Sequence, residues 1–377
     1  MEAGMAMEQV LPTVGGGGET SYASNSKLQG KSWLATMPML GYAIRELCGS
    51  LRPAEKLVVV DLGCSSGPNT LLVVSEVLKV VGDGVASREV ASPDLEVQFF
   101  LNDLSGNDFN QVFRSLDEYN RRKEAEGEEM GRLRVPYYVA GLPGSFYRRL
   151  LPCRSVHFFH SSHSVHWLSQ TPQGIEQLNK RNIYIAESSP PEVVKAYQNQ
   201  HQKDFCRFLE CRYAELTDEG RTMLMIPGRK NHDLPYHGIA HLFRLLAQAL
   251  STLVSEGTIR EEKLESYNVP LYYPSLEEIE AVLGRQGLFG MERTDMIEAN
   301  WDPFDESEDL SSSVDVEQSG KNIAKYMRAA LGPMIAHHFG EEVLDEVFSK
   351  YAANLSGHLL QEKTKYVFLI ILLKKKV

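Results

Sequence analysis

The stretch LVVVDLGCSSGPN, residues 57–69, decides the fold. Its apolar run ends on Asp61 and a glycine, and this predicts a buried strand over residues 57–63. Residues 64–81 repeat apolar side chains on one helical face, and Pro68 near their start favours a helix that begins there. A strand, a glycine turn and a helix in this order are typical of open α/β sheets, in which ligands bind beyond the carboxyl ends of the strands.

Further strands and helices alternate along the rest of the chain. The clearest strands are predicted at residues 95–103, 156–164, 222–228 and 365–373, and the clearest helices at 26–47 and 191–216. Strands that alternate with helices are typical of a doubly wound, mostly parallel sheet. The predicted fold class is therefore α/β with a Rossmann-like sheet.

The domain organisation predicted from this pattern is a single domain over residues 1–377. The Rossmann-like core lies mainly in residues 50–260 and is completed by the C-terminal strand 365–373. Helices within residues 261–362 are predicted to form an α-helical cap over the sheet.

Two segments are predicted to lie outside the packed core. The glycine run 15–18 predicts a flexible N-terminus over residues 1–18. Seven carboxylates among serines predict a mobile loop over about 302–320.

Composition and charge argue against several classes of partner. The net charge is −11, and the Lys and Arg residues are scattered along the sequence. Proteins that bind phosphate backbones usually cluster these residues, so nucleic acid is not expected as a partner. The longest uncharged apolar run, 367–373, is far shorter than a membrane helix, so no membrane is expected either. Five cysteines without a close CxxC pair, and an N-terminus without a secretory pattern, predict a cytoplasmic protein.

Acidic residues end two successive predicted strands. Asp61 closes the first, before Gly63 and Gly67, and Asp103 closes the second. A carboxylate offers several acceptor sites, so Asp103 can accept both ribose hydroxyls of an adenosine. The dinucleotide-binding motif GxGxxG has three glycines, and only two are present here. Their spacing favours a nucleoside cofactor without a pyrophosphate. The alternatives that need no ligand are a plain strand-to-helix turn at the glycines and a helix N-cap at Asp103.

Four histidines recur at every third position, as His157, His160, His163 and His166. Residues three apart on a strand point to opposite faces, so these side chains cannot converge on one metal ion. We interpret the first two as hydrogen-bonded strand histidines and predict that the last two reach a pocket beyond the strand end. Trp167 beside them offers an apolar body and one N–H donor, which suits an aromatic acid.

Blocks along the whole chain resemble the plant SABATH methyltransferases, the family of salicylate, benzoate, jasmonate, indole-acetate and caffeine-pathway enzymes. The resemblance begins at GGGGETSYASNSKLQ and continues through VVDLGCSSGPNT, FFLNDLSGNDFN, GLPGSFYRRLLP, FFHSSHSVHWLSQTP, EKLESYNVPLYYPS and AKYMRAALGP. It implies S-adenosylmethionine as the cofactor, a small carboxylic acid as the methyl acceptor, and a homodimer.

The resemblance also implies roles for individual residues. The positions that match those around the methionine end of the cofactor are Tyr22, Ser26, Asp61, Cys64 and Asn69. The ribose and adenine contacts would be Asp103, Leu104, Ser145 and Phe146. The donors to the substrate carboxylate would be Gln29 and Trp167, in a pocket lined by His163, His166 and Met327. A magnesium ion would be held by Asn179, Glu265, Tyr267 and Asn268, where Glu265 and Tyr267 replace the Asp and Phe that are usual in the family.

The implied reaction is an in-line displacement in which a carboxylate oxygen takes the sulfonium methyl. A substrate acid with a pKa of about 4 is ionised at neutral pH, so no general base is required. His163 and His166 replace the Tyr and Met that are common in salicylate enzymes, which predicts that benzoate is used at least as well as salicylate, with jasmonate as the alternative acid. The competing interpretations are an N-methyltransferase of the caffeine type, a protein that binds the cofactor without catalysis, and a nicotinamide dehydrogenase.

Overall fold

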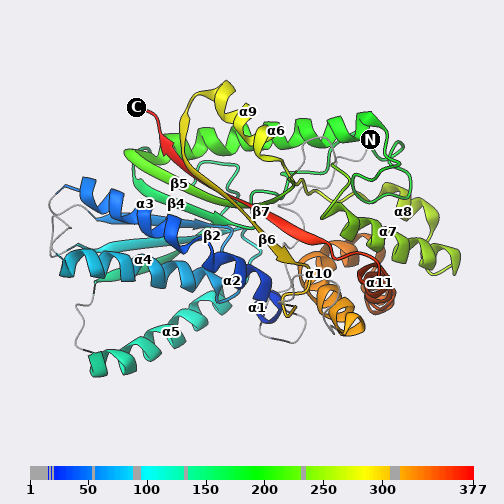
Figure 1. Ribbon diagram of the computed structural model, residues 1–377, viewed down its shortest axis with the longest axis horizontal. Helices are drawn as coiled ribbons and strands as arrows, with labels where there is room; N and C mark the ends of the chain where they lie inside the picture. Colours follow the sequence, from blue (N-terminus) through cyan, green and yellow to red (C-terminus); the bar gives the residue numbers. More distant parts are fainter. Residues whose placement is uncertain are drawn as a thin grey trace.

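A seven-stranded sheet forms the centre of the protein (Figure 1). The computed structural model describes residues 16, 18, 21–52, 56–87, 95–130, 135–230, 235–305 and 315–377. The strands are β1 (Leu57–Leu62), β2 (Val97–Asp103), β3 (Tyr137–Pro143), β4 (Val156–Ser162), β5 (Leu216–Gly228), β6 (Phe289–Asn300) and β7 (Lys365–Lys375). Their order is β3-β2-β1-β4-β5-β7-β6, and β7 runs antiparallel to both of its neighbours while β1 to β5 are parallel. The predicted α/β fold class is confirmed.

Helices cover both faces of this sheet and its carboxyl end (Figure 1). They are α1 (Tyr22–Asn25), α2 (Lys27–Leu34), α3 (Met37–Ser50), α4 (Asn69–Ala86), α5 (Phe109–Met130), α6 (Pro191–Glu215), α7 (Ala240–Ser255), α8 (Glu261–Ser266), α9 (Leu276–Gln286), α10 (Val316–Phe339) and α11 (Leu344–Leu359), with a 3-10 turn at Glu341–Val343. No described helix is both long and apolar enough to span a bilayer.

Neighbouring residues of the inner strands bury their side chains in different cores. Val59 and Phe158 pack with α3 and α4, whereas the next residues, Val60 and Phe159, pack with α6 and α9 on the other face. Successive side chains of a strand point to opposite faces, so an uninterrupted apolar run is what a sheet covered on both sides requires.

A third core lies beyond the carboxyl ends of the parallel strands. It joins the first part of α6 to α7, α10 and α11, and it includes Tyr197, Phe243, Met327 and Tyr351. These helices form the roof over the place where β1, β2 and β4 end (Figure 1). In an open α/β sheet, ligands bind beyond the carboxyl ends of the strands, and here the roof of helices covers that place.

The structure corrects the sequence prediction in the helix over 26–47 and at two edge strands. That helix divides into α2 and α3, because Pro38 in the first turn of α3 favours a new helix start. The strands β3 and β6 were not predicted, and β6 lies within the range that was assigned to the helical cap. Both are edge strands with partly exposed side chains, so neither has the buried apolar run that marks the inner strands.

The structure describes only part of the acidic segment around 302–320. Residues 306–314 lie outside the described residues, as do 1–15 of the predicted flexible N-terminus. The last part of the segment is helical rather than a loop, because Asp315 caps α10 by accepting from the backbone N–H groups of Glu317 and Gln318.

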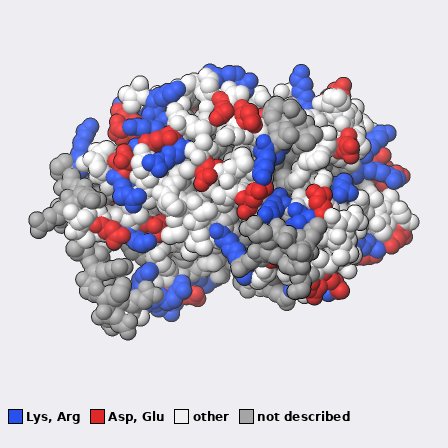
Figure 2. Space-filling model, viewed as in Figure 1, with Lys and Arg blue, Asp and Glu red and all other residues white. Residues whose placement is uncertain are grey.

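Charged side chains of both signs are mixed over the face that Figure 2 shows. Lys and Arg alternate with Asp and Glu there, without a continuous basic field among the described residues of that face. The described part of this face is therefore of mixed charge, and the whole sequence has a net charge of −11.

Candidate functional site

A cavity of about 380 Å³ lies between the carboxyl ends of the central strands and the roof of α7 and α10. One part of its wall comes from the turns after β1 and β2, with Gly63, Ser65, Asp103 and Leu104, and from Ser145 and Phe146 after β3. The other part comes from α2, the segment after β4 and α10, with Gln29, His163, His166, Trp167, Tyr326 and Met327. We call these the strand-end half and the roof half.

The turn after β1 requires glycine at position 63. Gly63 has a φ of +77°, and a Cβ at this position would lie 2.0 Å from Oγ of Ser164. The hydroxyl of Ser164 donates to the carbonyl oxygen of Gly63 at 3.3 Å, so the turns after β1 and β4 pack directly against each other. This close approach leaves the backbone after β1 exposed to the cavity without an intervening side chain.

Asp103 points its carboxylate at the same turn. Its Oδ2 accepts from the backbone N–H of Ser65 at 2.7 Å, and its Oδ1 accepts from the backbone N–H of Leu104 at 2.8 Å. Burial raises the pKa of Asp103 to about 6, and the two N–H donors oppose this shift. The side chain is thus a fixed acceptor at the wall of the cavity, at the position where the sequence predicts a ribose contact.

The carboxylate of Asp61 pairs with two neighbouring side chains. Its Oδ1 lies 2.7 Å from Nδ1 of His160, and its Oδ2 accepts from the hydroxyl of Thr70 at 2.6 Å. The side chain is buried and does not line the cavity. Asp61 therefore ties β1 to β4 and α4, and His160, like His157, whose Nδ1 accepts from Val58, is a hydrogen-bonded strand histidine as predicted.

The other residues predicted around the methionine end lie on the N-terminal helices and the glycine loop. Tyr22 of α1 lines the cavity. Ser26 and Asn69 lie just outside it, where the Asn69 amide donates to the carbonyl oxygen of Ser26 at 3.1 Å. Cys64 is buried, and its thiol donates to the carbonyl oxygen of Ser65. These contacts hold α1 and α2 against the turn after β1.

Gln29 and Trp167, the predicted donors to a carboxylate, both line the roof half of the cavity. Gln29 is buried, and its Oε1 has no hydrogen-bond partner among the described residues. A hydrogen bond from its side chain lowers the pKa of Tyr326. Burial is the larger effect and raises the pKa of Tyr326 to about 12. The backbone of Trp167 is fixed by the hydroxyl of Tyr147, which donates to its carbonyl oxygen at 2.5 Å.

His163 and His166 are neutral aromatic walls of the roof half. Nε2 of His163 lies 2.9 Å from Oγ of Ser32. The ring of His166 stacks on Tyr273 at 5.5 Å, and its buried Nδ1 has no hydrogen-bond partner in the part of the chain that the structure describes. Burial lowers the pKa of each imidazole to about 3. Neither ring carries a charge at neutral pH, so the roof half offers neutral donors and acceptors.

Backbone strain gathers at this cavity. Four residues other than glycine have a positive φ among those described, and two of them, Ser65 at +53° and His163 at +55°, line it. Such conformations are sparsely populated and persist where the surrounding structure over-determines them, often at ligand sites. In both cases the strained residue follows closely on the end of a central strand.

Several wall residues were missed by the sequence prediction. Tyr326, Phe243, Tyr273, Tyr366 and Phe368 all line the roof half. Tyr326 is next to the predicted Met327 in the same block, so that signal was available, whereas the others were not singled out by any predicted role.

Residues 205–216 and the region near His237 differ in their relation to the cavity, because the first range lies apart from it whereas Ile239 lines it. The residues of α6 in the first range pack into the core under β5 and β7, and they do not line the cavity. Asn231 lies outside the described residues, and His237 is exposed.

Three of the four residues predicted to hold magnesium, Asn179, Tyr267 and Asn268, are buried, and Glu265 is half-buried. The amide of Asn179 donates to Oδ1 of Asn268 at 2.8 Å, and Oδ1 of Asn179 accepts from the hydroxyl of Ser189 at 2.6 Å. Tyr267 is buried, and its ring packs against Phe339. Glu265 is the one carboxylate among the four residues. Magnesium prefers an octahedral set of carboxylate and water oxygens. The residues as placed do not fit this ion, and we derive no chemical step through it.

Comparisons with known proteins agree with this geometry. The family model described as "SAM dependent carboxyl methyltransferase" matches residues 8–376. The chain belongs to this family. As a carboxyl methyltransferase it uses S-adenosylmethionine to form the methyl ester of a small carboxylic acid.

Three known proteins show how far this likeness extends. The carboxyl methyltransferase is 42% identical to anthranilate O-methyltransferase 3 of Zea mays, over 99% of each chain. It is 44% identical to benzoate O-methyltransferase of Zea mays, over 96% of this chain and 97% of the relative. A solved structure, "Loganic acid methyltransferase with SAH", superimposes with a TM-score of 0.82 at 31% identity and covers 97% of this chain and 99% of its own.

Proposed function

We propose that this carboxyl methyltransferase esterifies an aromatic acid of the benzoate type, including benzoates with a small ortho substituent. The observation that carries the proposal is the roof half of the cavity, in which aromatic walls surround two neutral donors, Gln29 and Trp167. The relatives named for anthranilate and benzoate, which match nearly end to end, support the same class of acid. Jasmonate, with its flexible aliphatic chain, is the alternative acid to be tested.

The strand-end half fits the cofactor. Asp103 would accept from the ribose hydroxyls, the backbone at Gly63 would approach the methionine part, and Phe146 would cover the adenine. When bound, S-adenosylmethionine supplies a methyl group on a positively charged sulfur. Tyr22, which lines the cavity from α1, would close the N-terminal side over that group.

The roof half would orient the acid. An amide N–H of Gln29 and the indole N–H of Trp167 can each donate to a carboxylate oxygen without neutralising its charge as an Arg would. Holding the attacking oxygen about 3 Å from the methyl carbon and in line with it can contribute several kcal/mol. The enclosed cavity would also exclude water from two groups whose opposite charges cancel on transfer.

No side chain would need to remove a proton. The pKa of His163 and His166 is about 3, so these rings are poor bases at neutral pH. A benzoate-type acid, with a pKa of about 4, reaches the cavity already ionised. Catalysis would therefore come from position and from electrostatics alone.

The test is methyl transfer from labelled S-adenosylmethionine to a panel of benzoate, anthranilate, salicylate, jasmonate and a methylxanthine. We expect the benzoate-type acids to give the highest kcat/KM and the methylxanthine to give no transfer, since a purine provides no carboxylate for Gln29 and Trp167. A preference for jasmonate over every aromatic acid would refute the proposal and leave the family assignment intact.

We also propose a cytoplasmic location and a homodimer for this protein. All five cysteines are free, which suits a reducing compartment. Light scattering of the purified full chain tests the dimer, and a mass of about 42 kDa would contradict it.

A further inference from the structure

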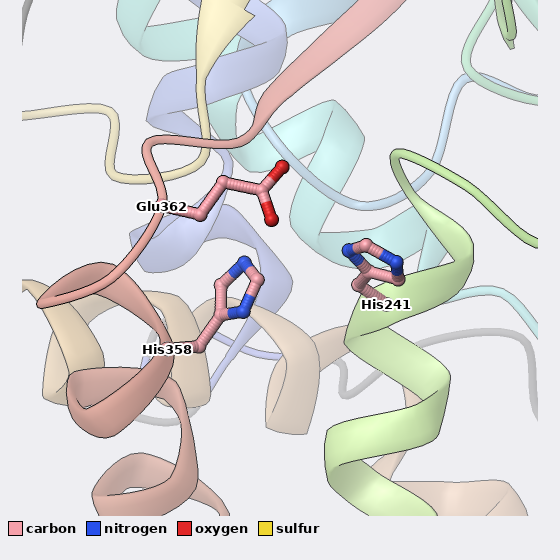
Figure 3. A group of neighbouring side chains, drawn as sticks. All are labelled: His241, His358 and Glu362. Atoms are coloured by element: carbon pink, nitrogen blue, oxygen red, sulfur yellow. The ribbon is translucent and has the colours of Figure 1, made fainter.

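A second group of ligand-type side chains lies in the cap, apart from the cavity. It consists of His241 in the first turn of α7, His358 near the end of α11, and Glu362 in the segment that leads into β7 (Figure 3). One ligand atom from each residue lies within 4.8 Å of the others. We propose that these three residues bind a divalent transition ion, with Zn²⁺ as the best match.

The donor set has the chemistry of a zinc site. Two imidazole nitrogens and one carboxylate oxygen are a common three-residue set for Zn²⁺, with water in the fourth position. A tetrahedral ion with bonds of about 2.0–2.1 Å needs ligand atoms about 3.3 Å apart. The ligand atoms would thus draw together by up to about 1.5 Å, and Glu362, which is exposed, can supply most of this movement.

Both imidazoles are in the neutral form, which can donate a lone pair to a metal ion. Nδ1 of His241 is buried and has no hydrogen-bond partner among the described residues, so an ion would satisfy an atom that is otherwise unpaired. Burial is the largest effect on the pKa of His241 and of His358 and lowers both, so the two rings are neutral at pH 7. A neutral ring is the form that binds a metal.

The ring of His358 is held in place from two sides. It stacks on Trp301 at 5.2 Å with an interplanar angle of 23°, and its Nε2 lies 2.7 Å from the hydroxyl of Thr364. If the ion binds Nδ1, the hydrogen bond to Thr364 remains and orients the ring, as such bonds do for other metal-binding histidines. If the ion binds Nε2, it replaces that hydrogen bond. In either case Trp301 lies against a ligand.

One charged group opposes the ion. Arg244, three residues after His241 on α7, lowers the pKa of both imidazoles through its charge, whereas Glu362 raises them. The positive charge of Arg244 therefore acts on the same atoms that would hold the cation. The side chain is exposed, so solvent and salt screen this repulsion, and removing it should tighten binding.

The site would connect separate parts of the cap. His241 belongs to the helix that carries Phe243 into the cavity, and Glu362 precedes Tyr366, another cavity residue, by four positions. A bound ion would thus link α7 to α11 and to the start of β7. It lies outside the cavity, so methyl transfer does not require it.

The experiment uses the full chain without a histidine tag, stripped with chelator and titrated with ZnCl₂ in a calorimeter. We expect one Zn²⁺ per chain, with binding at least about tenfold weaker in His241→Asn, His358→Asn and Glu362→Gln. Arg244→Gln should bind more tightly than the wild type. The matched control is His337→Asn, which removes an exposed histidine of α10 and should bind as the wild type does.

Fluorescence gives a second readout. Ni²⁺ at the site should quench Trp301, one of three tryptophans, and Glu362→Gln should reduce this quenching even if a histidine variant folds poorly. Wild-type affinity in folded Glu362→Gln and His241→Asn proteins would overturn the proposal. So would an equal loss of affinity in His337→Asn, because the binding would then be non-specific.

Discussion

The two halves of the cavity have different kinds of wall. In the strand-end half, bare backbone at Gly63 and the half-buried carboxylate of Asp103 lie at the ends of two neighbouring strands. The roof half has neutral donors and aromatic rings. A negative acceptor suits a cofactor with hydroxyl donors and a positive sulfur, and neutral donors suit an acid whose charge must be retained for attack. Under the proposed function, the difference would place acceptors near the positive cofactor and neutral donors near the acid.

The first prediction breaks the strand-end half. Asp103→Ala removes the fixed acceptor, and we expect it to weaken S-adenosylhomocysteine binding by about 3 kcal/mol, or roughly a hundredfold. Calorimetry measures this, and Asp117→Ala on the exposed face of α5 is the control that should change nothing. Unchanged affinity in a folded Asp103→Ala protein would show that this carboxylate does not contact the cofactor.

The second prediction breaks the roof half while the strand-end half stays intact. Trp167→Phe keeps the apolar ring but deletes the N–H donor, so kcat/KM for the acid should fall by about 2 kcal/mol, or roughly thirtyfold, with unchanged affinity for S-adenosylhomocysteine. Trp33→Phe removes the same indole N–H from a core away from the cavity and serves as the control. If both variants lose activity equally, Trp167 acts only through folding.

The third prediction separates the halves by pH. The pKa of Asp103 is about 6, so its carboxylate is ionised above that pH and becomes protonated below it. Affinity for the cofactor should be fully present above pH 6 and should fall by up to about tenfold per pH unit below it. The imidazoles of the roof half have a pKa of about 3 and do not titrate between pH 5 and 8. We therefore expect KM for the cofactor, but not KM for the acid, to rise from pH 7 to 5. An equal rise in both would contradict the assignment.

The fourth prediction sharpens the roof half. His166→Met replaces a rigid ring with a polar edge by a flexible thioether, which can wrap an ortho-hydroxylated ring more closely. The ratio of kcat/KM for salicylate over benzoate should rise by about 1 kcal/mol, or roughly fivefold. A wild type that already prefers salicylate strongly, or a ratio that does not move, would remove His166 from the determinants of specificity.

The strand-end half could be predicted from the sequence because it is local. The residues near Gly63 and Asp103 follow strong apolar strands, and the parallel arrangement brings neighbouring strand ends together. The contacts of Asp61 with His160 and Thr70 could not be predicted in the same way. Which way a side chain points at a strand end depends on the register of the neighbouring strand, and one sequence does not show it.

The roof half could be predicted only in part because its residues come from distant segments. Gln29, Trp167 and Met327 were named through a resemblance, whereas Phe243 and Tyr366 reach the cavity through the packing of α7 and β7. Periodicity shows which helix face is apolar, but it does not show whether that face meets a core or a cavity. The edge strand β6 was missed for a related reason, since most of its side chains are partly or fully exposed.

The position of β7 has a consequence for how the protein is made. It is the last strand along the sequence, yet it lies between β5 and β6 and pairs with both along nearly its whole length. While a ribosome is still producing the chain, β5 therefore presents an open edge, and β6 has no partner to join. Open apolar edges are templates for association with other chains. Chains released before Lys375 should thus be strongly prone to aggregate, and the sheet should become stable only once β7 has been synthesised.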